Sequence, residues 1–365
     1  MKIPRSLYSV IFALAGIVFS GISPAENLSS MPMGRGLPVE VFAGMTFNSI
    51  DAVTENDASF EASVDTRLSW IDRRLSYDKS KIVTPFLEYK DEAADKRLAE
   101  MWYPKIEFQN IKGTSSVEGK NLRIHPDGSV ELIRRESGKF STNFAMTNFP
   151  FDRQVLSVTL ISRYEPKSKV VLDFAEKQLN YSNSIYPEEI KGWDFDTVAL
   201  SKGAIAGLLD TQYSTLTSSL QIKRQPFSAV STIILPLICC LLIPLLVLWI
   251  NTLNMEEVHG FGEENSMLAS FAMTGIFAVV ALNFTVDTNY IQLIQGDNPV
   301  IRLFALNYFM LAFGIFISVA LYRYYIVKRF FGTYVQAELF YVLCWAVPVL
   351  CFSVTAAILA LAYFG

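Results

Sequence analysis

The chain has 365 residues, of which 51% are hydrophobic and 18% are charged, and its mean hydropathy is +0.30. This balance indicates a membrane protein that is long enough for two folded units. Its 31 basic and 35 acidic residues leave a net charge of −4 without a basic stripe, which argues against nucleic-acid binding. The chain has only two histidines, and its four cysteines all lie in apolar segments, so no zinc spacing is present. We therefore expect neither a metal site nor a cofactor.

Residues 1–25 have the pattern of a secretory signal peptide. Lys2 and Arg5 precede an apolar run at residues 10–19, and Ser23, Pro24 and Ala25 offer a small-residue cleavage site. The alternative is a fifth membrane helix, for which the apolar run is too short. The sequence after residue 25 is therefore expected outside the cell or in the periplasm.

Residues 26–225 read as strands, because short alternating runs are separated by turn residues. Phe60, Ala62, Val64 and Thr66 share one face of such a run. Residues 125–128, HPDG, have the composition of a hairpin turn, so His125 is interpreted as a turn residue and not as a metal ligand. Many short strands with almost no helical period favour a β-sandwich.

Residues 226–365 contain four apolar segments, at about 228–250, 266–286, 302–325 and 337–364. An even number of crossings returns the C-terminus to the outside, and Arg323, Lys328 and Arg329 then fall on the cytoplasmic side. The predicted fold is an α+β membrane protein, with an extracellular β-sandwich followed by a four-helix transmembrane bundle. The predicted location is the bacterial inner membrane, crossed several times.

The second apolar segment is unusually polar for a helix that faces lipid. Ser266, Ser270 and Thr274 follow one another at four-residue spacing, which places their hydroxyls on one face of a helix. The apolar residues Phe277, Ala281 and Phe284 continue this face. Carboxylates stand at its two ends, Glu263 at one and Asp287 at the other. Acidic rings, hydroxyls and an apolar constriction together suit a cation pore. The alternative is a membrane helix whose hydroxyls bond to neighbouring helices or to its own backbone.

Several motifs, spread over nearly the whole chain after residue 25, resemble one family. The motifs are FPFDRQ at residues 149–154, SWIDRRL at 69–75, WYPK at 102–105, GWD at 192–194, and Arg224-Gln225 before the first apolar segment. They resemble the pentameric ligand-gated ion channels of the Cys-loop receptor superfamily, and specifically the prokaryotic branch. Thr142 and Leu156 stand where animal receptors have the two loop cysteines, and their absence is usual for prokaryotic members.

The resemblance implies a homopentamer whose central pore is lined by the second helix. The pore-lining residues would be Glu263, Ser270, Thr274, Phe277, Ala281 and Phe284. The cytoplasmic mouth reads EENS at residues 263–266, where anion-selective relatives have a Pro-Ala-Arg type of sequence, so permeating monovalent cations are expected. In one departure, Glu264 lies farther from the first hydroxyl, on Ser270, than in cation-selective relatives.

The resemblance also implies a charge cluster where the sandwich meets the membrane. Asp152, Arg224 and an acidic residue of the first β-turn, either Glu55 or Asp57, would form it, beside Phe149, Pro150 and Phe151 of the FPFD loop. Arginine makes forked bonds to carboxylates, and a partly buried pair has two discrete arrangements that a ligand can bias. The alternative is a surface salt bridge of little energetic value.

For the agonist, the resemblance implies a site between subunits. The matching residues are Tyr103, Arg163, Tyr164, Glu165 and Tyr213. Arg163 stands where relatives have an aromatic residue, which disfavours an acetylcholine-like cation and suits a carboxylate or another anion; protons are a second possibility.

Taken together, the sequence predicts a ligand-gated ion channel subunit in a lipid bilayer. A non-conducting, membrane-anchored receptor would have the same domains, but it does not explain the hydroxyl face between acidic ends. An enzyme is not expected, because no nucleophile–base pair, metal cluster or phosphate loop is evident.

Overall fold

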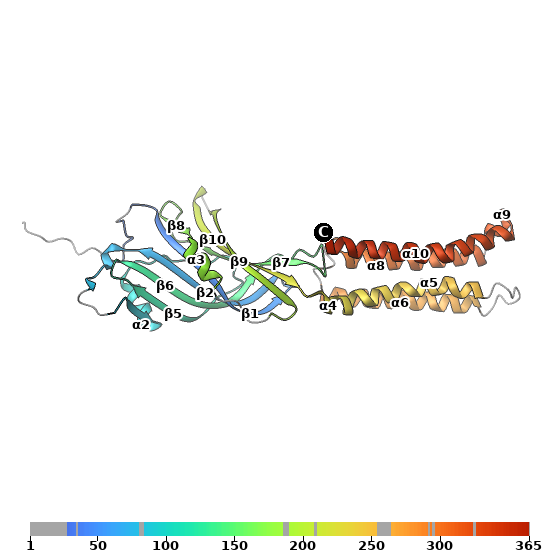
Figure 1. The fold of residues 1–365 in the computed structure, drawn as a ribbon, viewed down its shortest axis with the longest axis horizontal. Coiled ribbons are helices and arrows are strands. Elements are labelled where there is room, and N and C mark those ends of the chain that lie inside the picture. Colours follow the sequence, from blue (N-terminus) through green and yellow to red (C-terminus); the bar gives the residue numbers. More distant parts are fainter. Residues whose placement is uncertain are drawn as a thin grey trace, which may run out of the picture.

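The computed structural model describes residues 28–33, 36–79, 84–184, 190–207, 210–253, 264–290, 293, 296–323 and 326–364. The predicted signal peptide lies outside these ranges. The described residues form an elongated molecule, with a β-sandwich at one end and a bundle of long helices at the other (Figure 1). The predicted α+β membrane architecture is confirmed.

Two sheets build the sandwich. The first has the order β3-β5-β6-β2-β1-β8, in which β8 is parallel to β1 and the other pairs are antiparallel. Its strands are β1 Val39–Thr54, β2 Ser59–Ile71, β3 Leu87–Lys90, β5 Ser116–Ile124, β6 Ser129–Ser141 and β8 Val170–Asp173. The second sheet, β4-β7-β10-β9, is antiparallel and consists of β4 Glu107–Phe108, β7 Arg153–Ile161, β9 Trp193–Ala206 and β10 Gln212–Arg224.

The apolar faces of the two sheets meet in one core. Phe60 of β2 and Phe140 of β6 stack with ring centres 5.5 Å apart, and Phe108 of β4 meets Phe140 edge-on at 5.2 Å. The face of β2 that Phe60, Ala62, Val64 and Thr66 share, as the alternation predicted, is the buried one. Each buried aromatic ring removes a large apolar area from water, so these rings join the two sheets.

The predicted hairpin turn connects β5 to β6, and the amide of His125 donates to the carbonyl of Ser129 at 2.8 Å. Gly128 has a φ of +82°, and a Cβ at this position would lie 2.6 Å from the carbonyl oxygen of Asp72. Glycine is therefore required both by the backbone conformation and by the close approach of the turn to the end of β2.

Two short helices interrupt the strand pattern, which the sequence reading did not predict. They are α2, Glu92–Glu100, and α3, Glu176–Ser182. Helix α3 lies against β1, where the hydroxyl of Ser182 accepts a 3.0 Å hydrogen bond from the amide of Met45. Gly44 leaves room for this contact, because a Cβ there would lie 3.0 Å from the carbonyl oxygen of Gln178.

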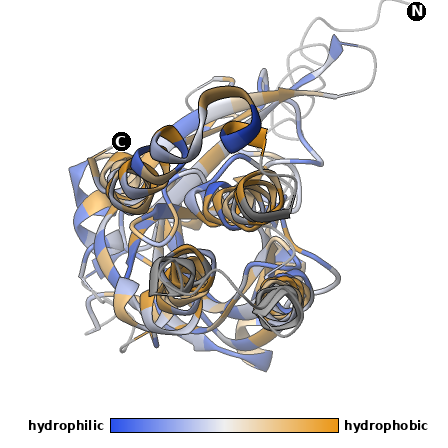
Figure 2. Ribbon diagram, turned by 90° about the vertical axis from the view of Figure 1, so that its right-hand side faces the viewer, coloured by the Kyte–Doolittle hydropathy of each residue, from blue (hydrophilic) through white to orange (hydrophobic). Residues whose placement is uncertain are grey.

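Four helical segments are long and apolar enough to cross a membrane: Pro226–Leu246, Ser270–Asn289, Pro299–Leu321 and Thr333–Phe364. They belong to α4 Pro226–Ala229 with α5 Leu235–Leu253, α6 Glu264–Asn289, α8 Pro299–Ser318 and α10 Thr333–Phe364, with the short α9 Ile326–Phe331 before α10. Figure 2 looks along the bundle and shows the four helices end-on, with mostly hydrophobic residues.

The first membrane helix contains a local irregularity next to a proline. A π-helical turn, Val230–Ile234, separates α4 from α5, and Pro236 follows it. Proline has no amide hydrogen and its ring collides with the carbonyl four residues earlier, so a wider turn at this place relieves the clash. The buried Asn307 of α8 donates to the carbonyl of Leu237, 3.2 Å away, and so ties α8 to α5 just after this turn.

Candidate functional site

Helix α6 leaves one face uncovered by the rest of the subunit. Ser270, Thr274, Phe277, Ala281 and Phe284 are all exposed on it. The opposite face is buried and consists of Ala272, Gly275, Val279 and Val286. Only 17% of this span is buried, compared with 33%, 41% and 33% of the other three. The predicted pore-lining residues therefore share a face that a single subunit does not cover.

The buried face of α6 packs closely against two other helices. A Cβ on Gly275 would lie 2.8 Å from the side chain of Leu311 in α8 and 3.1 Å from that of Ile243 in α5. The distance to Leu311 is shorter than real Cβ contacts and the distance to Ile243 is tighter than most of them, so glycine allows α6 to lie against both neighbours. This contact determines which face of α6 points away from the bundle.

The hydroxyls on α6 bond to the backbone of their own helix. Thr274 donates to the carbonyl of Ser270 at 2.8 Å, Thr285 to that of Ala281 at 2.9 Å, and Thr288 to that of Phe284 at 3.0 Å. This is the backbone bonding that the alternative interpretation expected. It uses only the hydroxyl hydrogen, however, and leaves oxygen lone pairs that can accept from water or contact a cation.

Of the two carboxylates at the ends of the predicted pore face, Asp287 lies within the described residues and Glu263 does not. Asp287 is exposed near the end of α6, three residues after Phe284 and thus on nearly the same face. Glu263 lies outside the described residues, and α6 begins at Glu264.

Arg224, the last residue of β10, lies at the centre of a charge cluster where the sandwich meets the helices. Its Nε is 2.7 Å from Oδ1 of Asp152, and its Nη2 is 3.1 Å from Oδ2 of the same carboxylate. Nη2 also lies 2.7 Å from Oε1 of Glu55. All three side chains are buried or nearly so, with 10%, 1% and 14% of their area exposed, which distinguishes the cluster from a surface salt bridge.

Aromatic rings enclose the guanidinium of Arg224. Its Cζ lies 4.2 Å from the ring centre of Trp193 and 4.9 Å from that of Phe149. Gln154 donates to Oδ2 of Asp152 at 2.5 Å, which satisfies a further lone pair of the carboxylate. Cation–π contacts and a second donor add to the ion pair, so the charges are well compensated despite their burial.

The burial of this cluster changes the protonation of its members. Desolvation raises the pKa of Glu55 and outweighs the attraction of Arg224. Desolvation alone would lower the pKa of Arg224, but the hydrogen bond to Asp152 and the charge of Glu55 outweigh it and raise that pKa. Within the cluster, Glu55 is therefore the residue that becomes protonated at a higher pH than an ordinary glutamate does.

Of the two acidic residues predicted for this cluster, Asp57 is not part of it. Its carboxylate bonds to Lys139 at 2.9 Å, and its carbonyl accepts from Lys112. The turn between β1 and β2 separates the two acids, with the amide of Ala58 bonded to the carbonyl of Glu55 and Ala58 at a φ of +47°. The turn directs Glu55 toward Arg224 and Asp57 toward β6.

The FPFD loop and the first β-turn both contact the membrane helices. Phe149 and Pro150 are buried, whereas the ring of Phe151 meets that of Tyr363, near the end of α10, edge-on at 5.3 Å. In the first β-turn, Asn56 donates to the carbonyl of Asn289 at the end of α6, 2.9 Å away. The charge cluster thus lies between two direct contacts to the bundle.

The predicted agonist residues that follow β7 lie on an exposed surface with charges of both signs. Nε of Arg163 is 3.9 Å from Oε2 of Glu107, and Nζ of Lys105 is 5.6 Å from the ring centre of Tyr164. Glu165 turns away from them and pairs with Lys169 at 3.2 Å. Arg163 and Tyr164 are exposed and both interact with Glu107, whereas Glu165 stabilises its own loop.

Tyr213 lies at the start of β10, beside the loop that contains Arg163. The amide of Ser162 donates to the carbonyl of Ser214, and that of Lys167 to the carbonyl of Gln212, at 3.1 and 2.8 Å. Both neighbours of Tyr213 therefore hold this loop. Tyr103 is half-buried and packs against the sandwich core, two residues before Lys105.

Comparisons with known proteins agree with this architecture. Residues 26–226 match the family described as the neurotransmitter-gated ion-channel ligand binding domain. The match covers more than half of the chain. The chain belongs to the pentameric ligand-gated ion channels of the Cys-loop superfamily.

Relatives of this channel occur in bacteria and in animals. It is 27% identical, over 265 residues, to the proton-gated ion channel of Gloeobacter violaceus, an alignment that covers 72% of this chain and 68% of the relative. It is 25% identical to the gamma-aminobutyric acid receptor subunit rho-3 of Rattus norvegicus and 26% to that of Homo sapiens. These two alignments cover 69% of this chain and about half, 54%, of each subunit.

Membership of the family confirms several sequence predictions at a coarse level. The channel is a multi-pass membrane protein with an extracellular ligand-binding domain, and it is not an enzyme. Members of the family are pentameric and are gated by small ligands or protons. Within the described ranges, no three histidine, cysteine or carboxylate side chains come together in a way that could hold a metal ion.

Sequence reasoning missed three residues of the junction between the domains. Trp193 covers Arg224, Asn56 bonds to the end of α6, and Tyr363 meets Phe151. Trp193 lies within a recognised motif, but its contact with Arg224 depends on the pairing of β9 with β10, in which the two residues are direct partners. Tyr363 is separated from Phe151 by most of the membrane domain, and no local pattern links them.

Proposed function

We propose that this protein is a cation-selective ligand-gated channel, in which identical subunits form a pentamer and α6 of each subunit lines the central pore. The observation that supports this most is the face of α6 from Ser270 to Phe284, which is exposed over its whole length while the opposite face is packed. A ring of identical subunits around a shared axis would cover this face with copies of itself and enclose water.

The order of groups on α6 supports a cation pathway. Asp287 would attract cations at the outer mouth, and Glu263 would do so at the inner mouth. Between them, the hydroxyl oxygens of Ser270 and Thr274 replace part of the lost hydration. Phe277 and Phe284 are seven residues apart, about 10.5 Å along the helix axis, and Ala281 lies between them. Two rings of aromatic side chains form an apolar constriction that closes by excluding water.

Gating in this proposal passes through the cluster of Arg224, Asp152 and Glu55. The cluster joins the first β-turn and the FPFD loop to Arg224, two residues before the first membrane helix begins at Pro226. Phe149, Pro150 and Phe151 complete the contact with the bundle. The ion pairs of Arg224 with Asp152 and Glu55 are nearly buried and have discrete geometries. A shift of one strand therefore switches Arg224 from one arrangement of partners to another, and the cluster does not deform gradually.

The proposed agonist is a small carboxylate or a proton, acting at the extracellular interface between subunits. Arg163, with Lys105 beside Tyr164, presents positive charge on the surface next to Tyr213. An exposed guanidinium suits a carboxylate through forked hydrogen bonds. One relative is named for protons and two are named for gamma-aminobutyric acid, so both classes occur among the proteins that this chain resembles.

The domain limits follow from the same proposal. Residues 1–25 would be removed as a signal peptide, residues 26–225 would lie in the periplasm and residues 226–365 would form the channel in the bacterial inner membrane. The last strand ends at Arg224 and the first helix begins at Pro226, in agreement with the second of these limits.

Accessibility of single cysteines tests the pore. In a background whose four native cysteines are replaced by alanine, cysteine at Ser270, Thr274, Phe277, Ala281 or Phe284 should react with a charged, membrane-impermeant thiol reagent and reduce the current. Cysteine at Val279, on the buried face, or at Phe316, exposed on α8, should not react. If no α6 position reacts in any state, α6 does not line a pore.

The current itself separates the channel from the alternative, a non-conducting receptor. Purified protein in a planar bilayer should conduct when pH is lowered or when small amines and carboxylates are added. Binding of such a ligand without any current would support the receptor interpretation.

A further inference from the structure

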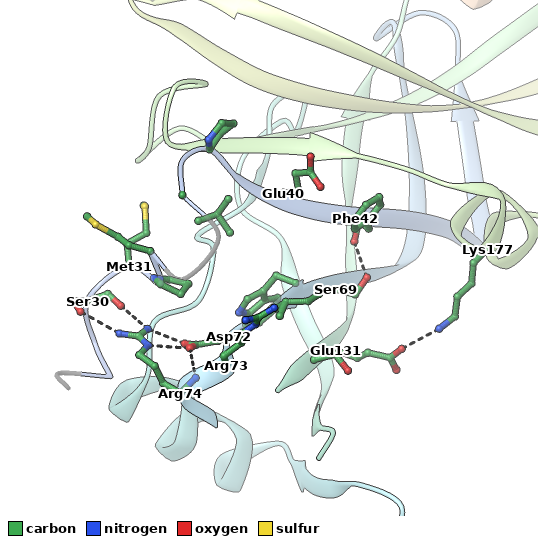
Figure 3. A pocket seen from close by; sticks show the side chains of 18 residues that line it. Ser30, Met31, Glu40, Phe42, Ser69, Asp72, Arg73, Arg74, Glu131 and Lys177 are labelled. Atoms are coloured by element: carbon green, nitrogen blue, oxygen red, sulfur yellow. Dashed lines mark hydrogen bonds and ion pairs between the residues drawn. The ribbon is translucent and has the colours of Figure 1, made fainter. Parts of the chain in front are cut away.

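The sandwich contains a cavity of about 1040 Å³ at the end farthest from the membrane helices. It lies where β1 begins and β2 ends, whereas the other end of β1 leads to Asn56, which touches α6. Figure 3 shows the cavity between the segment that precedes β1, the strands β1 and β2, and the start of β6. Its volume suits a small organic ligand.

One part of the wall is apolar. It consists of Met31, Pro32, Met33, Phe42 and Trp70. Trp70 is only 2% exposed, so the two thioethers and the ring of Phe42 form the accessible surface for a hydrocarbon or aromatic group. The segment with the methionines is held in place, because Arg74 donates to the carbonyl of Ser30 at 2.8 Å and the amide of Trp102 donates to that of Leu28 at 2.7 Å.

Most charged groups of the wall already have partners. Asp72 is fully buried and accepts from Nε and Nη2 of Arg74, at 2.9 and 2.7 Å. Glu131 is paired with Arg67 at 2.8 Å and with Lys177 at 3.4 Å. The bonds to Arg67 and Lys177 keep the pKa of Glu131 below its usual value although burial opposes them. These pairs shape the cavity and leave little charge for a ligand.

Two charged side chains of the wall remain. Glu40 of β1 and Arg73, the first residue of a 3₁₀ helix after β2, are exposed, and within the described part of the chain neither side chain has an ion pair or a hydrogen bond. They come from different elements and do not pair with each other. Figure 3 shows them apart, with the apolar side chain of Met31 on one side of the space. An unpaired carboxylate and an unpaired guanidinium therefore border the same apolar cavity.

We propose that this cavity binds a zwitterionic organic molecule with an apolar body, of the amino-acid type, with its ammonium group at Glu40 and its carboxylate at Arg73. The guanidinium offers a forked pair of donors to the ligand carboxylate. The ammonium gains from the carboxylate of Glu40 and from the faces of the aromatic rings. The apolar body lies against Met31 and Phe42, where its burial contributes through the hydrophobic effect.

Within one subunit, this cavity and the proposed agonist residues lie on different sheets. The cavity is formed by β1, β2 and β6 of the first sheet, whereas Arg163, Tyr164 and Tyr213 are associated with β7 and β10 of the second. The inference does not depend on which agonist opens the channel, and ligand binding at the cavity is measured without any current.

Calorimetry on the full-length protein in detergent tests the proposal with three probes. L-phenylalanine has both charges, phenylalaninamide has only the positive charge, and N-acetylphenylalanine has only the negative charge. The zwitterion should bind at least about tenfold more tightly than either analogue, because each analogue loses one charge-assisted contact. Equal affinity for all three probes, or binding of none, would overturn the proposal.

Conservative variants assign the charges. Glu40→Gln should weaken the binding of L-phenylalanine about tenfold and leave the binding of N-acetylphenylalanine unchanged. Arg73→Gln should also weaken the binding of L-phenylalanine about tenfold, but it should leave the binding of phenylalaninamide unchanged. Glu92→Gln and Lys96→Gln on α2 are matched controls with exposed side chains. Arg163→Gln should leave this binding intact. If Arg163→Gln removes the binding while Glu40→Gln and Arg73→Gln do not, the probe occupies the agonist surface and the cavity is not the site.

Discussion

Arg224 makes two hydrogen bonds to Asp152, a residue 72 positions earlier in the chain, at 2.7 and 3.1 Å. Arg224 ends the last strand, and the first membrane helix begins two residues later at Pro226. Asp152 belongs to the FPFD loop, and Glu55 adds the first β-turn to the same guanidinium. One side chain thus joins the first β-turn, the FPFD loop and the strand that leads into the first membrane helix.

Replacement of Arg224 by alanine should uncouple ligand binding from opening. Loss of one partner of a buried ion pair costs about 3–5 kcal/mol, because the remaining carboxylates lose their compensation. We expect the agonist response to disappear at normal surface expression, as measured by current and surface labelling. Lys139→Ala, which removes the exposed pair with Asp57, is the control and should change little.

If Arg224→Ala does not reach the surface, Arg224→Lys provides the test. Lysine keeps the charge but cannot make the forked contact. Normal gating in a variant that lacks this contact would show that the cluster has no role in coupling.

Acidification should act on the cluster through Glu55. Because desolvation raises the pKa of Glu55 above its usual value of 4.5, the folded protein holds this proton at a pH where the unfolded chain has released it. The contribution to stability is thus present below the usual value and is lost as pH rises through the folded pKa. Thermal unfolding from pH 4 upward should show this loss in the wild type and not in Glu55→Gln, and an identical pH profile of both proteins would contradict the assignment.

Phe277→Ala should open the pore without agonist. The side chain of Phe277 is 67% exposed on the isolated subunit, on the face proposed to meet its copies. A methyl group in place of a phenyl ring widens the apolar constriction and lets water enter. Spontaneous current in the absence of ligand is the measurement. Phe316→Ala, a similarly exposed position on α8, should leave the closed state unchanged, and an unaltered closed state in Phe277→Ala would exclude this residue as the gate.

The contact between Phe151 and Tyr363 should affect gating from the far end of the chain. Their rings meet edge-on at 5.3 Å, a geometry worth about 0.5–1.5 kcal/mol beyond the burial of area. A double-mutant cycle of Phe151→Ala and Tyr363→Ala, read as the shift in half-activating agonist concentration, should show coupling of this size. Strictly additive shifts would mean that the two rings do not act together.

Asp287→Asn should lower the conductance for cations. The exposed carboxylate stands at the outer end of the proposed pore face, where a ring of copies concentrates cations. The reduction should be largest at low ionic strength and fade as salt screens the charge. Single-channel recording at two salt concentrations measures this, and a reduction that is the same at both would indicate a structural effect instead.

The sequence predicted the elements of both domains with different reliability. Alternation identified β2 and its buried face because a strand exposes every second residue to the same side. The four spans were evident because a membrane helix needs about 20 apolar residues. Helices α2 and α3 were missed, since each is a short surface element whose contacts, such as that between Ser182 and Met45, are not local in sequence.

The class of this protein could be predicted without a structure, because family motifs, apolar lengths and helical spacing are properties of local segments. Ser270, Thr274 and Phe277 share a face in any α-helix. The tertiary structure decided which face of α6 is free, through the fit of Gly275 against Ile243 and Leu311. It also decided that Glu55, and not Asp57, binds Arg224, since two acids in one turn are equivalent until the backbone directs them to different partners.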